Sequence, residues 1–337
     1  MVEKKQANKN DMIPKKYVDV PKLYGDVPTF MGCPAVYTPD DLKGADIVIL
    51  GIPFDGVATF RGGATRLAPQ FIRKYSLLWG SYNLSIDLDI SREVKVVDYG
   101  DIDVLPGNEV ESYRRAEERL SHILKAGAVP IGIGGDHGIT IPMVRAVART
   151  QEQTPMGVII FDTHQDMFHD MQGNLLTRSS PTRRITELPQ VDPKHMIIIG
   201  ARGPRNPEDG ALLLKKLGIT CVTMDEIEER GIEDVAQQAL IIACPEGNRP
   251  YISVDIDVFD PGFAPATNSP DPGGLSPREI IKALRIVTQY GLIGFDIAEV
   301  APEYDTTGGI TSILASRVIT EIIGCLAQVK ARQKKDL

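Results

Sequence analysis

Residues 156–166 read MGVIIFDTHQD and carry the pattern that decides the fold. The run 156–162 is apolar almost throughout and rich in Val and Ile, which is typical of a strand covered on both faces of a parallel sheet. It ends in acidic and histidine side chains, so reactive groups stand at its carboxyl end. Seven runs of similar texture recur along the chain, at 46–54, 94–100, 129–135, 196–202, 220–224, 250–258 and 293–300.

Segments with helical periodicity lie between most of these runs, at 109–125, 141–150, 207–217, 232–244, 277–290 and 308–330. This alternation predicts one α/β domain with helices on both faces of a parallel sheet. The domain is expected to span 41–337, because no linker or repeat interrupts the pattern. Residues 1–40 are predicted to form an extended N-terminal arm, either loose or packed on a neighbouring subunit. The long loops 57–66, 163–182 and 259–275 are expected to be functional.

The bulk composition restricts partners and location. The chain has 337 residues and a formal net charge of −8. It lacks the basic footprint of a nucleic-acid-binding protein, so no nucleic-acid partner is expected. It shows no secretory signal and no apolar run near the ~18 residues that span a bilayer, so no membrane association is expected. The scattered cysteines predict buried free thiols in a reducing, cytoplasmic compartment; they are Cys33, Cys221, Cys244 and Cys325.

Three clusters of acidic and histidine residues sit at the ends of predicted strands. GGDH covers 134–137, DTHQD covers 162–166, and SVDIDVFDP covers 253–261. In the second cluster, groups at i, i+2 and i+4 of an extended chain project on one side. Burying three such groups without a cation would be costly, so this cluster predicts metal binding.

The three clusters are expected to meet, because the carboxyl ends of parallel strands share one sheet edge, where open α/β sheets place their sites. One metal ion would leave ligands unused, whereas two ions sharing bridging carboxylates would use them all. The oxygen-rich set suits manganese, and the histidines leave nickel, cobalt or iron open. The six candidate ligands are His137, Asp162, His164, Asp166, Asp255 and Asp257.

Two ions about 3.5–4 Å apart can lower the pKa of a bridging water towards ~7, which gives a metal-bound hydroxide as nucleophile. Other chemistries fit less well. Ser253 and the cysteines have no evident base partner, so Ser/His or Cys/His catalysis is disfavoured. GIGG at 132–135 is no nucleotide-binding loop, since His137 stands where the third glycine of G-x-G-x-x-G is needed. A lone Asp-His pair after Gly-Gly is often only a turn, so the metal hypothesis depends on all three clusters.

These motifs resemble those of the ureohydrolase family, which contains arginases, agmatinases and related guanidino hydrolases. The resemblance extends from about residue 45 and includes GIPFDG (51–56), RLAPQFIR (66–73), VDYGD (97–101) and FDIAEV (295–300). Segments 263–279 and 308–319 look most like the agmatinase branch. The resemblance implies an arginase-like fold, a three-layer α/β/α domain around an eight-stranded parallel sheet.

The resemblance also implies a role for each site residue. Asp166 would orient the hydroxide, and Glu299 would accept hydrogen bonds from the NH₂ groups of the substrate. Two divalent ions per chain, Mn²⁺ or Ni²⁺, and a homo-oligomer, trimer or hexamer, are implied in the same way. The two implied ligand sets share Asp162 and Asp255 as bridges: His137, Asp162, Asp166 and Asp255 for one ion, and His164, Asp162, Asp255 and Asp257 for the other.

The loop after the second motif departs from the family. It reads FHDMQGNLLTRSSPTRRI over 168–185, and Arg178 stands where the family usually carries a histidine. Three interpretations are open. Arg178 is structural and points away, it meets a substrate carboxylate or another polar group, or the site is rebuilt for another guanidine compound with His169 or a water as proton shuttle. Two smaller departures are Gly138, where serine is common, and the double glycine within 57–66.

The combined prediction is a cytoplasmic, binuclear metal-dependent amidinohydrolase that cleaves a guanidino C–N bond. Candidate substrates are guanidine, biguanides such as metformin, and guanidino acids. Agmatine is disfavoured, because a positive charge at Arg178 would repel its distal ammonium. Two alternatives are a formimino-group hydrolase and a non-catalytic subunit that supports a paralogous partner in a hetero-oligomer.

Overall fold

The protein is described by a computed structural model that covers residues 28–56, 61, 63–151 and 155–335. Eight strands form one sheet in which every neighbouring pair is parallel. They are β1 (Ile47–Ile52), β4 (Val96–Asp101), β5 (Val129–Gly134), β6 (Val158–Phe161), β7 (Met196–Ala201), β8 (Thr220–Thr223), β9 (Tyr251–Asp255) and β10 (Gly294–Ala298). Their order across the sheet is β4-β1-β5-β10-β9-β6-β7-β8. The predicted eight-stranded parallel α/β fold is confirmed.

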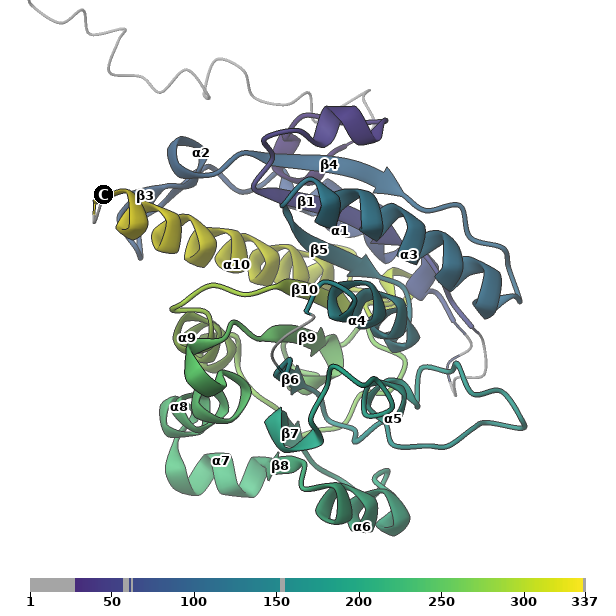
Figure 1. Ribbon diagram of the computed structural model, residues 1–337. Coiled ribbons are helices and arrows are strands. Elements are labelled where there is room, and N and C mark those ends of the chain that lie inside the picture. The colour runs from purple at the N-terminus through teal and green to yellow at the C-terminus, as the bar shows by residue number, and fades with distance from the viewer. Residues whose placement is uncertain (1–27, 57–60, 62, 152–154, 336–337) are drawn as a thin grey trace, which may run out of the picture.

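Helices cover both faces of the sheet and make a three-layer arrangement (Figure 1). One face carries α1 (Ala68–Ser76), α7 (Met224–Arg230), α8 (Ile232–Ala243), α9 (Pro277–Val287) and α10 (Ile310–Lys335). The other carries α3 (Glu109–Lys125), α4 (Thr140–Ala148), α5 (Pro181–Ile185) and α6 (Glu208–Leu217). Both helix layers exclude water from the sheet, which explains why the strands read as continuous apolar runs.

The strand β1 illustrates how the two cores are divided. All six of its residues are buried, and successive side chains point to opposite faces. Ile47 and Ile49 enter the core beneath α1 and α10, whereas Val48 and Leu50 enter the core beneath α3 and α4. Both faces of β1 are therefore buried, so each of these positions needs an apolar side chain. A polar residue at any of them would be buried.

Local capping signals fix where several helices begin. Ser276 and Glu279 form a capping box at α9, and the Ser276 N–H donates to the Glu279 carboxylate at 2.7 Å. Thr223 and Glu226 form the same motif at α7, with an N–H to carboxylate distance of 2.8 Å. These bonds satisfy backbone donors that the first helical turn leaves without partners.

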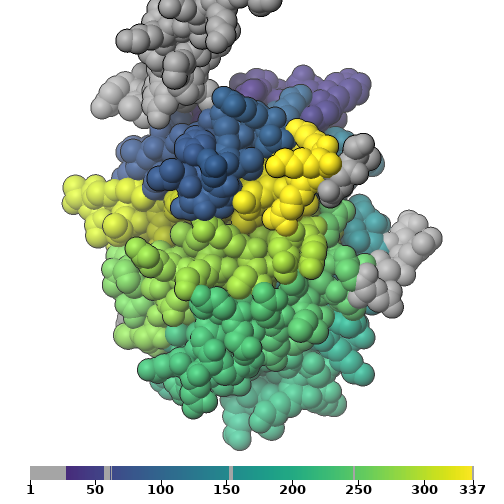
Figure 2. Space-filling view, turned by 90° about the vertical axis from the view of Figure 1, so that its left-hand side faces the viewer, coloured from purple at the N-terminus to yellow at the C-terminus, as the bar shows by residue number. Residues whose placement is uncertain are grey.

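The helix α10 is long and apolar enough to cross a membrane by length and composition alone, with a mean hydropathy of 1.6. However, 78% of its most apolar window is buried inside the domain, where it packs on α1 and α9. Figure 2 shows its yellow C-terminal end beside the blue segment that includes α2 (Ile90–Glu93). We therefore regard α10 as a core helix of the domain.

Several short elements were not predicted. The hairpin of β2 (Tyr82–Asn83) and β3 (Leu88–Asp89) and the helices α2, α5 and α7 have at most seven residues per element, too few for a clear period. The nine-residue helix α1 was also not predicted. The predicted strand 250–258 stops at Asp255 and continues as a 3₁₀ turn. Within the part of the chain that the structure describes, the 3₁₀ turns are Phe30–Gly32, Pro39–Leu42, Thr65–Leu67, His137–Ile139, Pro193–His195, Pro245–Gly247, Ile256–Val258 and Pro302–Tyr304.

The predicted N-terminal arm falls mostly outside the described residues, which begin at residue 28. Its described part, 28–40, packs on the domain. Phe30 is fully buried, and its N–H donates to the Asp98 carboxylate at 2.9 Å. Ala35 pairs with Asp98 as a further parallel bridge beside β4.

The four cysteines form no disulfide within the described residues, as expected. The expectation that all four are buried is wrong for three of them. Cys325 is buried in α10, but Cys33, Cys221 and Cys244 are only partly buried. These three lie near the ends of strands or helices, where packing is less complete than in the middle of the layers.

Candidate metal centre

The three acidic and histidine clusters lie at one edge of the sheet. They follow β5, β6 and β9, and Glu299 follows β10 directly. These four strands are adjacent in the order β5-β10-β9-β6, although β5 and β6 are consecutive in the sequence. The sheet therefore brings segments more than 150 residues apart to the same carboxyl edge, where ligands bind in open α/β sheets.

In two of the clusters, an aspartate side chain accepts a backbone N–H two residues further on and so turns the chain. These turns bring the ligands of each cluster together. The Asp162 carboxylate accepts the N–H of His164 at 2.6 Å, and the Asp255 carboxylate accepts the N–H of Asp257 at 2.9 Å. Each aspartate thus turns the chain at the end of its strand. The expectation that Asp162, His164 and Asp166 project from an extended chain is wrong, because the chain leaves β6 at this turn.

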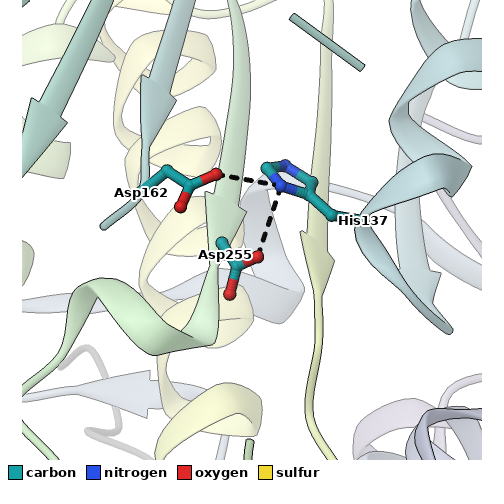
Figure 3. Close-up of side chains that lie close together, drawn as sticks. All are labelled: His137, Asp162 and Asp255. Carbon is teal, nitrogen blue, oxygen red and sulfur yellow. Dashed lines mark ion pairs between the residues drawn. The ribbon is translucent and has the colours of Figure 1, made fainter. Parts of the chain in front are cut away.

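His137 is the centre of the first ligand group. Its Nδ1 lies 3.0 Å from Asp162 Oδ2 and 3.3 Å from Asp255 Oδ2, and the three side chains point toward one another from separate segments (Figure 3). Asp166 Oδ2 also lies 3.0 Å from His137 Nδ1. All four side chains are buried or nearly so.

The second ligand group contains Asp162, His164 and Asp257. His164 Nδ1 lies 3.1 Å from Asp257 Oδ2 and 3.6 Å from Asp162 Oδ1. In each group the candidate ligand atoms lie within 4.8 Å of one another, and Asp162 belongs to both groups. One carboxylate shared by two adjacent groups is an arrangement that suits a pair of ions.

The buried ligand atoms fit divalent cations. His137 Nδ1 and Asp162 Oδ2 lie 3.0 Å apart and are buried, but neither has a hydrogen-bond partner among the described residues. Atoms buried in this way are costly unless a cation satisfies them. Imidazole nitrogens and carboxylate oxygens are also the donors that first-row metal ions such as manganese and nickel accept.

Burial and mutual charge perturb the titration of the cluster strongly. Burial raises the pKa of Asp255 well above its usual value, and the charges of Asp257 and Asp162 raise it further. Burial raises the pKa of Asp166 to about 6, and Asp162 contributes in the same direction. Burial disfavours charged His164, but the carboxylates of Asp257 and Asp162 outweigh it and raise its pKa to about 12. Perturbations of this size concentrate at functional sites.

A buried polar network lies behind His137. Its Nε2 is 3.0 Å from Ser253 Oγ, and Ser253 Oγ donates to Asp296 Oδ1 at 2.8 Å. Thr140 and Tyr251 also donate to the Asp296 carboxylate. With Nε2 donating to Ser253, Nδ1 faces the carboxylate cluster, where a neutral ring would offer its lone pair to a cation.

This network corrects the expectation that Ser253 has no base partner. Ser253 does contact a histidine, but it is fully buried in β9, and its own proton is directed to Asp296. A nucleophile needs access to the substrate, so the contact orients His137 and does not activate the serine.

Glu299 closes the site from β10. Its carboxylate accepts the backbone N–H of His137 at 2.9 Å and the amide of Asn268 at 3.3 Å. Glu299 and Asp166 have φ values of 63° and 49°. Residues other than glycine rarely adopt this left-handed backbone conformation. Such strain clusters at functional sites. Asn268 was not predicted as a site residue; its only signal was its place in the long loop 259–275.

A cavity of about 380 Å³ opens over the metal-ligand groups. Asp166, Glu299 and Arg178 all reach it, so the structure brings these three predicted catalytic residues together. His169 is exposed and is not among the residues that line the cavity. The lining consists of His164, Gln165, Asp166, Phe168, Met171, Arg178, Ser179, Arg205, Asn206, Pro207, Asp255, Asp257, Ser269 and Glu299.

Arg178 points into the site. Its Nη1 lies 3.8 Å from Glu299 Oε2, and only 12% of its side chain is exposed. Burial raises the pKa of Glu299, and the Arg178 charge opposes that shift. The interpretation in which Arg178 points away from the site is therefore wrong. Arg205, the other arginine of the cavity lining, is exposed at the rim.

Asp136 is a further site residue that was not singled out. Its carboxylate accepts the N–H of Gly56 at 2.6 Å and the N–H of Gly138 at 3.0 Å, so it ties the segment after β1 to the segment after β5. Burial raises the pKa of Asp136 to about 7, and the neighbouring charge of Glu299 adds to the shift. Its sequence signal was its place within GGDH (134–137), where the predicted metal ligand is His137.

A sequence profile of the arginase family matches residues 45–325. The chain belongs to the arginase family. Membership agrees with the eight-stranded parallel sheet, and the chain is accordingly an amidinohydrolase of guanidino compounds, a hydrolase of C–N bonds in linear amidines.

Individual arginase-family relatives match over most of the chain. The sequence is 38% identical to proclavaminate amidinohydrolase of Streptomyces clavuligerus over 296 residues, 88% of this chain and 91% of that enzyme. It is 34% identical to guanidinopropionase of Pseudomonas aeruginosa, over 90% of this chain and 93% of that enzyme. The solved structure of the Streptomyces enzyme superposes with a TM-score of 0.83 at 36% identity, covering 91% of this chain and 99% of that one.

Proposed function

We propose that this amidinohydrolase works with two divalent metal ions held at the carboxyl edge of the sheet. The observation that carries the proposal is the pair of ligand groups that share Asp162. His137, Asp166 and Asp255 would complete the first site, and His164 and Asp257 the second. When bound, two such ions lower the pKa of a shared water and so supply the nucleophile at neutral pH.

Glu299 and Asp166 would position the substrate and the attacking water. Glu299, held by the His137 N–H and by Asn268, would accept hydrogen bonds from the guanidinium of the substrate. Asp166 lies beside the first ligand group and would accept a hydrogen bond from the attacking water. The water oxygen bonds to the central guanidine carbon, the C–N bond to the amine breaks, and the amine leaves with a proton. The products are an amine and urea, or a substituted urea from a biguanide, and guanidine itself gives urea and ammonia.

The proton shuttle is assigned to solvent water. The family position for a shuttle histidine is occupied by Arg178, whose guanidinium stays protonated in proteins. His169, the other candidate, lies outside the cavity lining. The cavity opens to solvent over the cluster, so water reaches the leaving group.

The substrate is a small guanidino compound, and the candidates are guanidino acids, guanidine and biguanides such as metformin. Guanidinopropionase, one of the relatives, is named for a guanidino acid, which supports that class within the range. Arg178 places a positive charge at the cavity, which disfavours the distal ammonium of agmatine. We further propose a cytoplasmic homo-oligomer, trimer or hexamer, in which each subunit carries its own ligand set.

Metal analysis combined with a substrate panel tests the proposal. The purified chain, saturated with Mn²⁺ or Ni²⁺ and freed of excess metal, should retain two ions and release urea from at least one guanidino compound. Formamide from a formimino compound would instead identify a formimino hydrolase. Two bound ions without turnover until a paralogous subunit is added would identify a supporting subunit, and failure to bind metal would remove the proposal altogether.

A further inference from the structure

We propose that Arg178 determines the substrate class of this site by placing an internal guanidinium beside Glu299, so that a productive substrate must carry a carboxylate on its tail to draw Arg178 away. The inference rests on the proposed function, because it takes Glu299 as the acceptor of the substrate guanidinium. It goes further in naming the substrate class and the residue that selects it.

The Arg178 guanidinium faces Glu299 Oε2, the carboxylate oxygen that does not accept the His137 N–H. Their closest nitrogen and oxygen atoms are 3.8 Å apart, an ion-pair distance that places the arginine where a substrate guanidinium would approach this oxygen. A substrate guanidinium that reaches Glu299 must therefore push the Arg178 side chain aside. The same chemistry, a planar fork of N–H donors facing a carboxylate, is present in both the arginine and the substrate.

The backbone of Arg178 is held in place from several sides. Ser180, fully buried, accepts the N–H of Thr177 at 3.1 Å and donates to the carbonyl of Leu175 at 2.8 Å. The N–H of Phe168 donates to the carbonyl of Ser179 at 3.1 Å. These bonds flank Arg178 on both sides, so its displacement from Glu299 is a rotation of the side chain within a fixed loop.

Gly138 lies beside this loop. A Cβ atom at position 138 would lie 3.4 Å from the backbone nitrogen of Arg178 and 2.2 Å from the hydroxyl of Tyr113. The two departures from the family pattern, Gly138 and Arg178, thus lie against each other in space. Their proximity indicates that the arginine is part of a consistently rebuilt wall of the cavity.

The charges of the cavity determine which group on the tail of a substrate can replace Glu299 as the partner of Arg178. The base is acidic, with Asp166, Asp255, Asp257 and Glu299, and the cationic side chains of the lining other than histidine are Arg178 and Arg205. A tail ammonium would be repelled by a displaced Arg178, whereas a carboxylate would pair with it and offset the lost contact with Glu299. The site therefore selects a guanidino acid and discriminates against an aminoalkyl guanidine.

The unaltered metal-loaded protein provides the first test. Calorimetry compares the binding of 3-guanidinopropionate with that of propylguanidine, which has the same length but no carboxylate. The conditions are chosen so that the bound compound is not hydrolysed or is turned over at most once. The acid should bind at least about tenfold more tightly, as expected for one added charge-assisted contact. Equal binding would overturn the proposal.

Substitution provides the second test. In Arg178→Gln, the affinity for guanidinium chloride should rise about tenfold, because the internal competitor is lost, while the ratio of kcat/KM for the acid to that for agmatine should fall by about tenfold or more. Arg183→Gln is the matched control. Its side chain pairs with Glu187 at 3.6 Å outside the cavity lining, and both quantities should stay at the wild-type value.

The outcomes separate this inference from the proposed function. Unchanged guanidinium affinity in Arg178→Gln, or a shift in specificity produced by Arg205→Gln instead, contradicts the role of Arg178. Wild-type protein that releases urea from agmatine, guanidine or metformin but not from guanidino acids also contradicts it, while the amidinohydrolase proposal stands. If the wild-type protein bound no metal and hydrolysed no substrate, the proposed function would be rejected. The titration of wild type and Arg178→Gln with guanidinium chloride would still measure whether Arg178 competes for Glu299.

Discussion

The Nε2 atom of His137 lies 3.0 Å from the hydroxyl of Ser253, on the side of the ring opposite the carboxylate cluster. This contact fixes the rotation of the ring, and Nε2 is its donor because the Ser253 hydroxyl donates to Asp296. His137 comes from the segment after β5 and Ser253 from β9, so the first ligand group depends on packing between non-neighbouring strands.

The first prediction concerns this contact. Ser253→Ala should weaken metal binding by about 10–100-fold, because partners that orient a metal-binding histidine typically contribute that much. The measurement is a titration with Mn²⁺ under a competing chelator. Ser112→Ala is the control: Ser112 is also fully buried and hydrogen-bonded, but to Leu105 and away from the site. Equal loss in both variants would show that the effect is general destabilisation.

The second prediction distinguishes the two ligand groups. Asp162→Asn should lose both ions, because Asp162 belongs to both groups, whereas Asp257→Asn should keep the ion of the first group. Metal content after gel filtration gives the stoichiometry. Asp260→Asn is the control from the same sequence motif; Asp260 accepts N–H groups of Gly262 and Gly273 and belongs to neither group. Identical stoichiometry in Asp162→Asn and Asp257→Asn would contradict a shared ligand.

The third prediction concerns the stability of the N-terminal edge of the sheet. Arg73 is buried and donates to both oxygens of Asp98, at 2.8 and 2.9 Å, and also pairs with Asp101. Arg73→Leu should lower the free energy of unfolding by about 3–5 kcal/mol, because it leaves the buried Asp98 carboxylate without its cation. Urea unfolding followed by circular dichroism measures the change.

A control for that change is Arg92→Leu. The Arg92 side chain is 77% exposed and pairs with Asp89 at 3.3 Å. Its loss should change the free energy of unfolding by less than about 1 kcal/mol, as is usual for exposed ion pairs. A similar loss in both variants would mean that burial does not distinguish the two pairs.

The fourth prediction concerns Gly138 and Tyr113. Gly138→Ala should destabilise the protein by about 1–3 kcal/mol, because the added methyl group would meet the Tyr113 hydroxyl, 2.2 Å from its ideal position. Tyr113→Phe removes that hydroxyl, which has no hydrogen-bond partner among the described residues. The double variant should recover about 0.5–3 kcal/mol relative to additivity, the range for residues in contact. Strict additivity in a thermal unfolding cycle would show that the two positions are not in conflict.

Much of the fold was predictable from the sequence. The apolar runs identified all eight strands of the sheet, because a strand covered on both faces needs apolar residues at successive positions. Six of the helices were also identified, within a few residues at their ends. The helices α1, α2, α5 and α7 were missed, since short helices owe their stability to packing more than to a periodic signal.

The candidate site was predictable in composition but not in arrangement. The clusters at 134–137, 162–166 and 253–261 named the metal-ligating residue types, because aspartate and histidine at strand ends are recognisable in one dimension. Asn268 and the contact of Ser253 with His137 were missed. Neither carries a local signal, and each becomes meaningful only through a partner on another strand.

The sequence by itself determined the strands, the alternation with helices and the stock of ligands, because backbone preferences and burial periodicity act over a few residues. Only the tertiary structure decided that β10 and β9 lie between β5 and β6, and therefore that Glu299 faces His137. It also decided that Arg178 turns toward Glu299. Such contacts depend on long-range chain crossovers and loop packing, which no short stretch of residues specifies.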